Sequence, residues 1–193
     1  MNFLNLDNKK IKFWKAVEEK EGQYSDFPYW VDHDLKNAIH KLGITKLYKH
    51  QSIAIELVYR KENVLLTTPT SSGKTLVYNI PVLNDILRHK ESRALYIFPL
   101  KALQQDQLEK LREIDENLPY NKDFSFEVYD GDTDDERKRF IRHNTPNIII
   151  TNPDELHCAI LRYKEKWEKF FKNLKYVIVD ESHIYRGIFG THF

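Results

Sequence analysis

The alternation of apolar and polar positions along the chain predicts strands and helices in regular succession. Short apolar runs typical of buried strands occupy residues 64–66, 93–99, 124–129, 147–151 and 176–179. Polar stretches with helical apolar spacing follow four of these runs, after Thr75, from Leu100, from Asp132 and from Pro153. A nearly continuous apolar strand is typical of a sheet that is covered on both faces. The pattern therefore predicts an α/β fold with a mostly parallel sheet and helices on both faces.

Two shorter amphipathic helices are predicted upstream of the first strand. Asp34 is the expected N-cap of one of them, and Gly43 stands where a left-handed C-terminal cap belongs. The next helix begins at or near Gln51. The residues expected on its inward face are Ile53, Leu57 and Val58.

Local sequence signals also mark the starts of two later helices. Thr133 and Glu136 have the spacing of a capping box, in which each side chain bonds the backbone N–H at the other end of the turn. Asn152 is a candidate N-cap, and Pro153 suits the first helical position because its missing N–H has no partner there in any case.

A run of small polar residues, NVLLTTPTSSGKT over 63–75, joins the first predicted strand to its helix. The small residues at its turn are Thr70, Ser71, Ser72 and Gly73. Their backbone N–H groups can surround an anion, and the positive end of the helix adds to the attraction. Lys74 would then reach the β- and γ-phosphates of a nucleotide, and the Thr75 hydroxyl would bind Mg²⁺. Thr68 occupies the first glycine position of the strict pattern, so an ordinary turn remains the alternative.

A pair of carboxylates, Asp180 and Glu181, directly follows the last predicted strand. In parallel sheets, ligands lie beyond the carboxyl ends of the strands, so this pair is expected near the phosphate loop. Asp180 is the candidate Mg²⁺ ligand, and Glu181 is the candidate base that orients and deprotonates an attacking water.

Composition places limits on the class of protein. Thirty basic and 29 acidic residues give a net charge of +1, so any nucleic-acid binding must be local. Cys158, the single cysteine, excludes an intrachain disulfide and is expected to be a small buried residue on a helix. No apolar run approaches the ~18 residues of a membrane span, and the N-terminus lacks the apolar core of a signal peptide. We therefore expect a cytoplasmic domain without a membrane partner.

The phosphate loop and the carboxylate pair together resemble those of the DExH-box branch of superfamily 2 ATP-dependent helicases. The resemblance covers roughly residues 43–193. The acidic motif reads Asp180-Glu181-Ser182-His183. Gln51 matches the glutamine that reads the adenine ring in that family, because a carboxamide can pair with the N6–H and N7 edge of adenine. A solvated glutamine on a helix surface is the alternative. The resemblance implies a first RecA-like domain of the P-loop type that uses ATP and Mg²⁺.

Three further stretches resemble the nucleic-acid-facing motifs of the family. They are Phe98–Leu103, Tyr129–Thr133 and Thr151–Asp154. The positions that would face one strand of nucleic acid are Pro99, Lys101, Gly131 and Thr151. Lys101, Gly131 and Thr151 would contact its sugar–phosphate backbone, and such contacts fix position without reading sequence. Taken singly, Lys101 is better explained as a solvated loop lysine and Thr151 as a strand-end threonine, whereas together with the nucleotide motifs they favour nucleic-acid binding.

The residues after the acidic motif narrow the resemblance to a subgroup of DNA repair helicases. They read YRGxFGxH over 185–192. Full-length members of the subgroup carry a second RecA-like domain, to which His183 would link the ATP site; a packed or solvent-exposed histidine is the alternative. In the family, a further strand lies between the phosphate-loop strand and the strand that ends in Asp180. We therefore expect this chain to be a fragment whose sheet is incomplete at the C-terminus.

The predicted organisation is an N-terminal arm over residues 1–30 and the first RecA-like domain over 31–193. The predicted function is the ATP-binding motor of a helicase that translocates on single-stranded nucleic acid, with DNA expected and RNA as the alternative. An isolated fragment is expected to hydrolyse ATP very slowly, because an arginine finger from a second domain contributes about 10³–10⁵ in rate. A non-catalytic nucleotide- or nucleic-acid-binding module is the rival hypothesis, and the sequence leaves the oligomeric state open.

Overall fold

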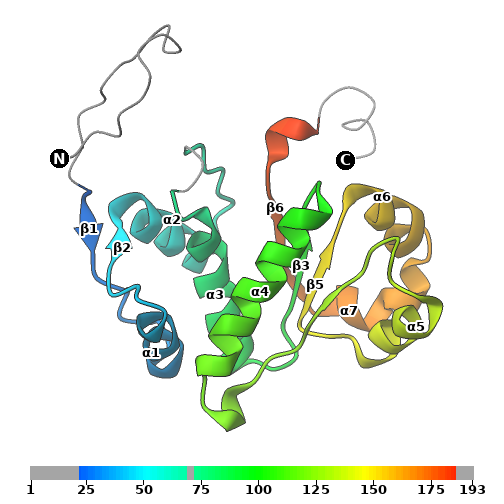
Figure 1. Ribbon diagram of the computed structural model, residues 1–193, viewed down its shortest axis with the longest axis horizontal. Helices are drawn as coiled ribbons and strands as arrows, with labels where there is room; N and C mark the ends of the chain where they lie inside the picture. The colour runs from blue at the N-terminus through cyan, green and yellow to red at the C-terminus, as the bar shows by residue number, and fades with distance from the viewer. Residues whose placement is uncertain (1–21, 69–71, 186–193) are drawn as a thin grey trace, which may run out of the picture.

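The computed structural model describes residues 22–68 and 72–185 of the chain (Figure 1). Its strands are β1 (Tyr24–Ser25), β2 (Leu47–Tyr48), β3 (Arg93–Ile97), β4 (Phe126–Val128), β5 (Ile148–Thr151) and β6 (Leu174–Val179). Its α-helices are α1 (His33–Lys41), α2 (Lys49–Tyr59), α3 (Lys74–Arg88), α4 (Lys101–Asn117), α5 (Asp135–Asn144), α6 (Pro153–Glu155) and α7 (Glu168–Lys172). Shorter turns are the 3₁₀ helices η1 (Tyr120–Lys122), η3 (Lys164–Trp167) and η4 (Ser182–Ile184), and the π-helical segment η2 (Leu156–Leu161).

The centre of the fold is a four-stranded sheet in the order β4-β5-β3-β6, with every pair parallel. Ala94 of β3 lies opposite Ile148 on one side and Tyr176 on the other. The carboxyl ends of all four strands therefore meet at one edge of the sheet. A separate antiparallel pair, β1 with β2, lies beside α2.

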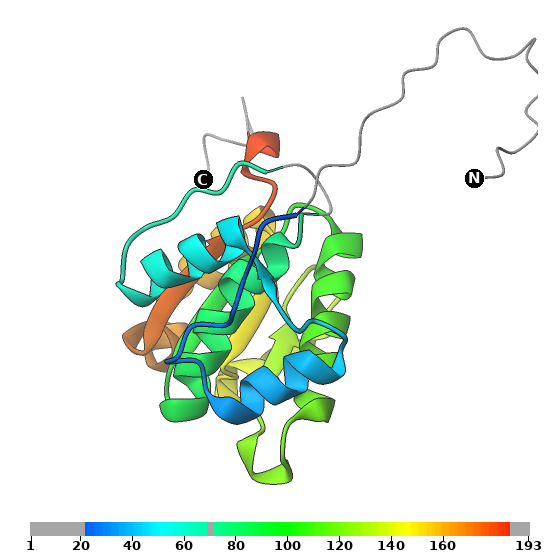
Figure 2. The ribbon, with the colours of Figure 1, turned by 90° about the vertical axis from the view of Figure 1, so that its left-hand side faces the viewer.

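Each face of the sheet buries its own apolar core. Ala94, Tyr96 and Phe98 point to the face that α1, α2, α3 and α4 cover. Leu95 and Ile97 point to the other face, against α5, η2, η3 and α7. Figure 2 shows α1 and α2 in front of α3, as an outer layer on the first face. The prediction of a parallel α/β sheet with helices on both faces is confirmed.

The first 30 residues were predicted to form an arm. Residues 1–21 lie outside the described part of the chain. Phe27 and Trp30 are buried in the first core, and Trp30 stacks on Tyr59 of α2 with ring centroids 4.0 Å apart. The described part of the predicted arm, residues 22–30, therefore packs on the domain.

Two predicted N-caps are displaced by one or two residues. Asp32 caps α1 in place of Asp34, because its side chain accepts from the backbone N–H groups of Asp34 and Leu35. Asp134 caps α5, whereas the Thr133 hydroxyl bonds the Asp130 carboxylate instead of closing a capping box.

Three other signals are confirmed. Gly43 has φ +86°, and the N–H groups of Gly43 and Ile44 donate to the carbonyls of His40 and Ile39, which satisfies the end of α1. Asn152 caps α6, with Pro153 at its start.

Two burial predictions are wrong. Ile53 is 54% exposed, because α2 turns Ala54 and Ile55 towards the core in its place. Cys158 is exposed, since it lies on the outer side of the π-helical segment η2, of which only Ile160 is buried.

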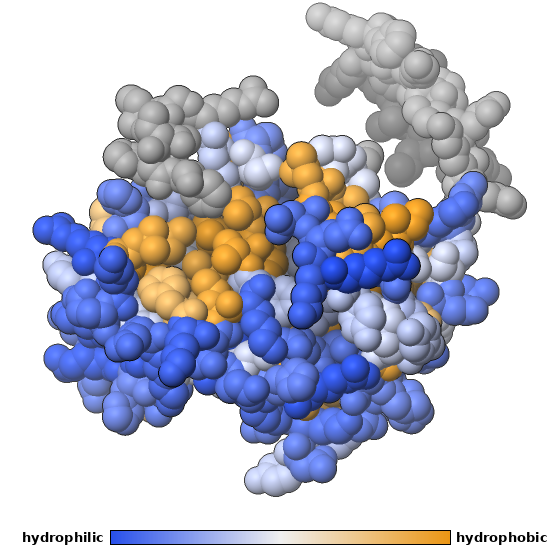
Figure 3. Space-filling model, turned by 180° about the vertical axis from the view of Figure 1, so that it is seen from behind, coloured by the Kyte–Doolittle hydropathy of each residue, from blue (hydrophilic) through white to orange (hydrophobic). Residues whose placement is uncertain are grey.

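The predicted strand over residues 64–66 does not form. These residues run as irregular chain, and Leu65 is 80% exposed. A strand needs a neighbour that pairs with its backbone. Among the described residues, β6 pairs with β3 alone, and a cavity separates its outer edge from residues 62–68. Val177 of β6 is 56% exposed. Figure 3 shows apolar side chains gathered on one face of the molecule.

Candidate nucleotide site

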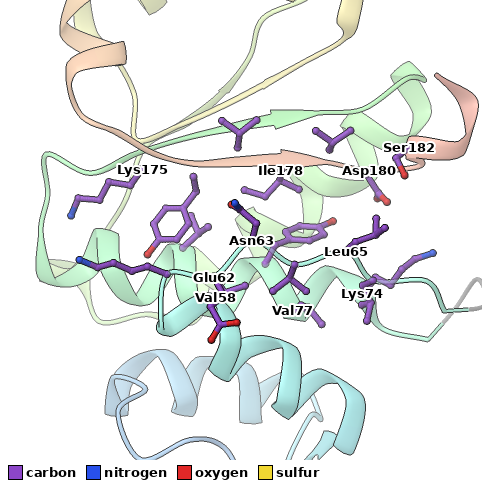
Figure 4. Close-up of a pocket in the computed structure, with 18 of the residues that line it drawn as sticks. Val58, Glu62, Asn63, Leu65, Lys74, Val77, Lys175, Ile178, Asp180 and Ser182 are labelled. Atoms are coloured by element: carbon purple, nitrogen blue, oxygen red, sulfur yellow. The ribbon is translucent and has the colours of Figure 1, made fainter. Parts of the chain in front are cut away.

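A cavity of about 1000 Å³ lies between α3, residues 61–68 and the open edge of β6. Lys74, Asp180 and Ser182 lie towards the same end of it (Figure 4), where the first turn of α3 faces the carboxyl end of β6. Glu181 and His183 line it as well. Residues 106 positions apart in sequence are thus brought to one cavity, in the place where parallel sheets bind ligands.

The turn before α3 has the backbone that an anion-binding loop requires. Gly73 has φ +73° at the N-cap of α3, a conformation that a residue without a Cβ adopts at little cost. The Lys74 ammonium donates to the carbonyl of Thr68 at 3.3 Å, and the hydroxyls of Thr68 and Ser72 are 2.6 Å apart. Thr70 and Ser71 lie outside the described residues. The part of the loop next to α3 fits a phosphate group. Lys74 and the first turn of α3 supply positive charge, and Gly73 has no side chain that would exclude the phosphate.

Gln51 holds this turn from the side of α2. Its Oε1 accepts from the backbone N–H of Tyr48 at 2.7 Å, and its Nε2 donates to the carbonyl of Gly73 at 2.8 Å. Gln51 is 2% exposed, so the alternative of a solvated glutamine on the helix surface is wrong. Oε1 keeps a second lone pair and Nε2 a second N–H, so adenine recognition by Gln51 would require the buried side chain to become accessible rather than to break these bonds. The neighbouring His50 places Nε2 3.2 Å from the carbonyl of Ser72, a contact that sequence patterns did not predict.

The contact between Gln51 and Gly73 leads to a prediction. A Cβ on Gly73 would lie 2.3 Å from Gln51 Nε2, and the left-handed backbone would be strained as well. Gly73→Ala is therefore expected to weaken ATP binding about tenfold, which corresponds to the ~1–2 kcal/mol cost of that conformation. Equilibrium binding of a non-hydrolysable ATP analogue measures it.

Gly43→Ala is the matched control, because Gly43 also has positive φ but a Cβ there meets no atom within 4 Å. It should leave nucleotide affinity unchanged. Unaltered binding by Gly73→Ala would contradict the assignment of this turn to the nucleotide.

The acidic motif is held by short contacts. The backbone N–H of Asp180 donates to the carbonyl of Ile97, at the end of β3, and Asp180 Oδ1 accepts from the N–H of Glu181 at 2.8 Å. Glu181 has φ +49°, an uncommon conformation for a residue with a side chain. Its Oε2 lies 3.1 Å from Nδ1 of His183, whose side chain is 67% exposed. Backbone strain of this kind is concentrated at functional sites.

Tyr78, which sequence reasoning missed, links the two halves of the site. Burial raises the pKa of its hydroxyl well above the usual range; a hydrogen bond with the Thr75 hydroxyl opposes the rise, and the charge of Asp180 adds to it. Tyr78 and Asp180 line the same cavity, and Thr75 precedes Tyr78 by one helical turn on α3. A hydroxyl and a carboxylate are hard oxygen ligands that suit Mg²⁺. The signal for Tyr78 was its position three residues after Thr75, on the same side of α3.

The candidate nucleic-acid positions lie along the same edge of the sheet, after β3, β4 and β5. Lys101 and Gly131 are exposed, and Pro99 is half-buried. The prediction that Thr151 contacts nucleic acid through its side chain is wrong. Thr151 is fully buried, and its hydroxyl donates to the carbonyl of Tyr129 at 2.7 Å. Its hydroxyl is therefore not available to a nucleic acid at this surface.

Lys101 forms an ion pair with Asp132, which raises the pKa of the Lys101 ammonium. A phosphate group would compete with this carboxylate. Asp132→Asn is therefore expected to increase affinity for single-stranded DNA about two- to fivefold, the range of exposed ion pairs. Fluorescence anisotropy of a labelled oligonucleotide at fixed salt measures the change.

Asp106→Asn is the control, because it makes the same change of charge at another exposed ion pair of α4, with Lys110. It should change affinity by less than Asp132→Asn. Equal effects of the two substitutions would show that net charge alone, and not release of Lys101, controls binding.

Comparisons with known proteins agree with this geometry. A family model described as DEAD/DEAH box helicase matches residues 48–193. The uncharacterized ATP-dependent helicase YprA of Bacillus subtilis is 44% identical over 96% of this chain and 24% of its own length. ATP-dependent helicase hrq1 of Schizosaccharomyces pombe is 42% identical over 89% of this chain and 16% of its own.

A solved structure titled DUF1998 helicase MrfA bound to DNA and AMPPNP superposes with a TM-score of 0.86 and 45% identity. The match covers 91% of this chain and 24% of that one. This chain thus spans about a quarter or less of the length of these relatives. DEAD-box helicase Mss116, at 22% identity and a TM-score of 0.73, supports the fold alone.

Proposed function

Because this chain belongs to the DEAD/DEAH box helicase family, we propose that it is the ATP-binding motor domain of an ATP-dependent DNA helicase of the repair type. The observation that carries the proposal is the convergence of Lys74, Asp180 and Glu181 on one cavity at the carboxyl edge of a parallel sheet. Relatives named as ATP-dependent helicases support ATP as the nucleotide.

Each residue has one task in this proposal. Bound Mg-ATP supplies the phosphoryl group and a cation that neutralises its charge. Lys74 and the backbone around Gly73 hold the phosphates, while Thr75 and Asp180 offer oxygens to Mg²⁺. Glu181 orients the attacking water and accepts its proton, in a position held by His183.

Single-stranded DNA is the proposed nucleic acid. The structure titled as MrfA bound to DNA supports it, since the two chains are 45% identical. Pro99, Lys101 and Gly131 are the proposed contacts, because they lie on exposed or half-exposed turns at the edge that also carries the nucleotide site.

A second RecA-like domain and a cytoplasmic location belong to the proposal too. His183, largely exposed beside Glu181, is available to contact such a domain. The open edge of β6, with the exposed side chains of Val177 and Leu65 beside the cavity, supports the expectation that the sheet of the full-length protein has a further strand here. No described helix is long and apolar enough to cross a membrane.

The test is ATP turnover by the full-length protein with no nucleic acid, with single-stranded DNA, and with RNA of the same length and sequence. DNA is expected to stimulate turnover on the order of tenfold, within the usual range of coupling between two sites. Greater stimulation by RNA would favour the RNA helicase alternative. Binding of ATP and DNA without turnover under any condition would favour a non-catalytic module.

A further inference from the structure

Buried hydrogen bonds join α3 to α4 beneath the candidate site. The Tyr78 hydroxyl donates to Gln107 Oε1 at 3.2 Å, and Gln107 Nε2 donates to Asn79 Oδ1 at 3.0 Å. The Tyr96 hydroxyl of β3 donates to the same Asn79 oxygen at 2.9 Å. Gln107 is 2% exposed and Asn79 is 1% exposed, so these groups depend on one another for partners.

One end of this network lies at the nucleotide site. Tyr78 is one helical turn after Thr75, the candidate Mg²⁺ ligand, so the two side chains lie on the same side of α3. The Tyr78 ring also lines the cavity and packs edge-on against Tyr96, with ring centroids 5.4 Å apart. A displacement of Tyr78 would therefore act directly on the position of the Thr75 hydroxyl.

The other end lies in the helix that follows the candidate nucleic-acid turn. α4 begins at Lys101, and Gln104, fully buried in its first turns, places Nε2 3.5 Å from the carbonyl of Phe98. Gln107 follows three residues later on the same side of the helix. Because a helix moves as a rigid unit, a shift at Lys101 would move Gln107 with it.

The network also has unused hydrogen-bonding capacity. Asn79 Nδ2 and Gln104 Oε1 are buried without a hydrogen-bond partner among the described residues. An unpaired buried group costs free energy, which lowers the cost of moving these side chains into an arrangement that gives it a partner. A purely structural contact between two helices would be met more simply by apolar side chains.

We propose that Tyr78 and Gln107 are positioning residues that couple nucleic-acid binding at the turn before α4 to the Thr75 hydroxyl in the nucleotide site. The inference rests on the proposed function, because it assigns a coupling path to that ATPase. Nucleic acid that binds Lys101 shifts α4 and therefore displaces Gln107. The displacement of Gln107 moves Tyr78, which changes the position of the Thr75 hydroxyl. By reciprocity, nucleotide binding changes affinity for the nucleic acid through the same bonds.

The test uses Tyr78→Phe and Gln107→Leu in the full-length protein, each of which preserves much of the side-chain shape and removes the bond between them. We expect turnover without DNA to stay within about twofold of wild type in Gln107→Leu, which lies outside the cavity, and stimulation by single-stranded DNA to fall about tenfold in both variants. The second readout is the ratio of dissociation constants for DNA with and without a non-hydrolysable ATP analogue. It should move towards one in both variants.

Tyr96→Phe is the matched control, since it removes another buried hydroxyl of the network, the one bonded to Asn79, but leaves the bond between Tyr78 and Gln107 in place. It should keep stimulation near that of wild type. Stimulation within twofold of wild type in Tyr78→Phe overturns the inference, as does an equal loss in Tyr96→Phe. A wild-type protein that is not stimulated by DNA at all overturns the proposed function together with it, so the two failures are distinguishable.

Discussion

Replacement of Glu181 by Gln is expected to lower ATP turnover of the full-length protein by about 10²–10⁴-fold, the usual contribution of a positioned general base. Glu181 lines the cavity beside Asp180, and its backbone is held at φ +49°. The amide of Gln keeps the shape of the side chain but cannot accept the proton of the attacking water. Single-turnover hydrolysis at saturating ATP measures the change.

Nucleotide affinity separates loss of the base from loss of the site. Gln at position 181 removes one negative charge near the phosphates, so binding of ATP should be unchanged or slightly tighter. Glu127→Gln is the matched control, because Glu127 pairs with Arg137 and lies on β4, at the opposite edge of the sheet from β6. Turnover of Glu181→Gln within tenfold of wild type would remove Glu181 from the role of base.

Much of the architecture followed from local sequence patterns. The runs at 93–99 and 147–151 are buried on both sides, so they contain enough apolar residues to be recognised without knowledge of their neighbours. Asn152 and Pro153 also predicted the start of α6 correctly, because a cap and its helix are adjacent in sequence. Asp32 was missed as the cap of α1 because Asp34, two residues later, is an equally suitable residue type.

The failure at residues 64–66 has a different cause. A strand is defined by a partner, and β-favouring residues without one remain irregular chain. The described edge of β6 is separated from these residues by the cavity, so no local propensity could decide the outcome. Ile53 shows the same limit on a helix, since a shift of one or two residues in the buried face exchanges Ile53 for Ala54 and Ile55.

The candidate site was predictable in part. The motif at 73–75 and the pair at 180–181 gave its residue types, and the order of strands and helices predicted that they would meet. Partners that depend on packing were not predictable. The bonds of Gln51 to Tyr48 and Gly73, the burial of Thr151 and the bond of Tyr78 to Gln107 all depend on how separate elements approach one another.

Lys74→Ala is expected to reduce ATP turnover of the full-length protein by about 10²–10³-fold, as removal of one preorganised donor to developing charge does in other enzymes. The Lys74 ammonium now contacts the carbonyl of Thr68, a neutral acceptor that a phosphate group would displace. Its loss should weaken binding of ATP more than binding of a nucleoside, because the charge acts on the phosphates.

Lys175→Ala provides a control within the same cavity. Lys175 lies at the opposite end from Lys74 (Figure 4) and pairs with Asp85 at 3.0 Å. The substitution Lys175→Ala removes the same charge from the same cavity as Lys74→Ala. It should nevertheless change turnover by less than about twofold, because exposed ion pairs contribute little. If both variants lose activity equally, general electrostatic attraction accounts for the effect. Normal turnover in Lys74→Ala would place the phosphates elsewhere, and the site proposed at the first turn of α3 would have to be abandoned.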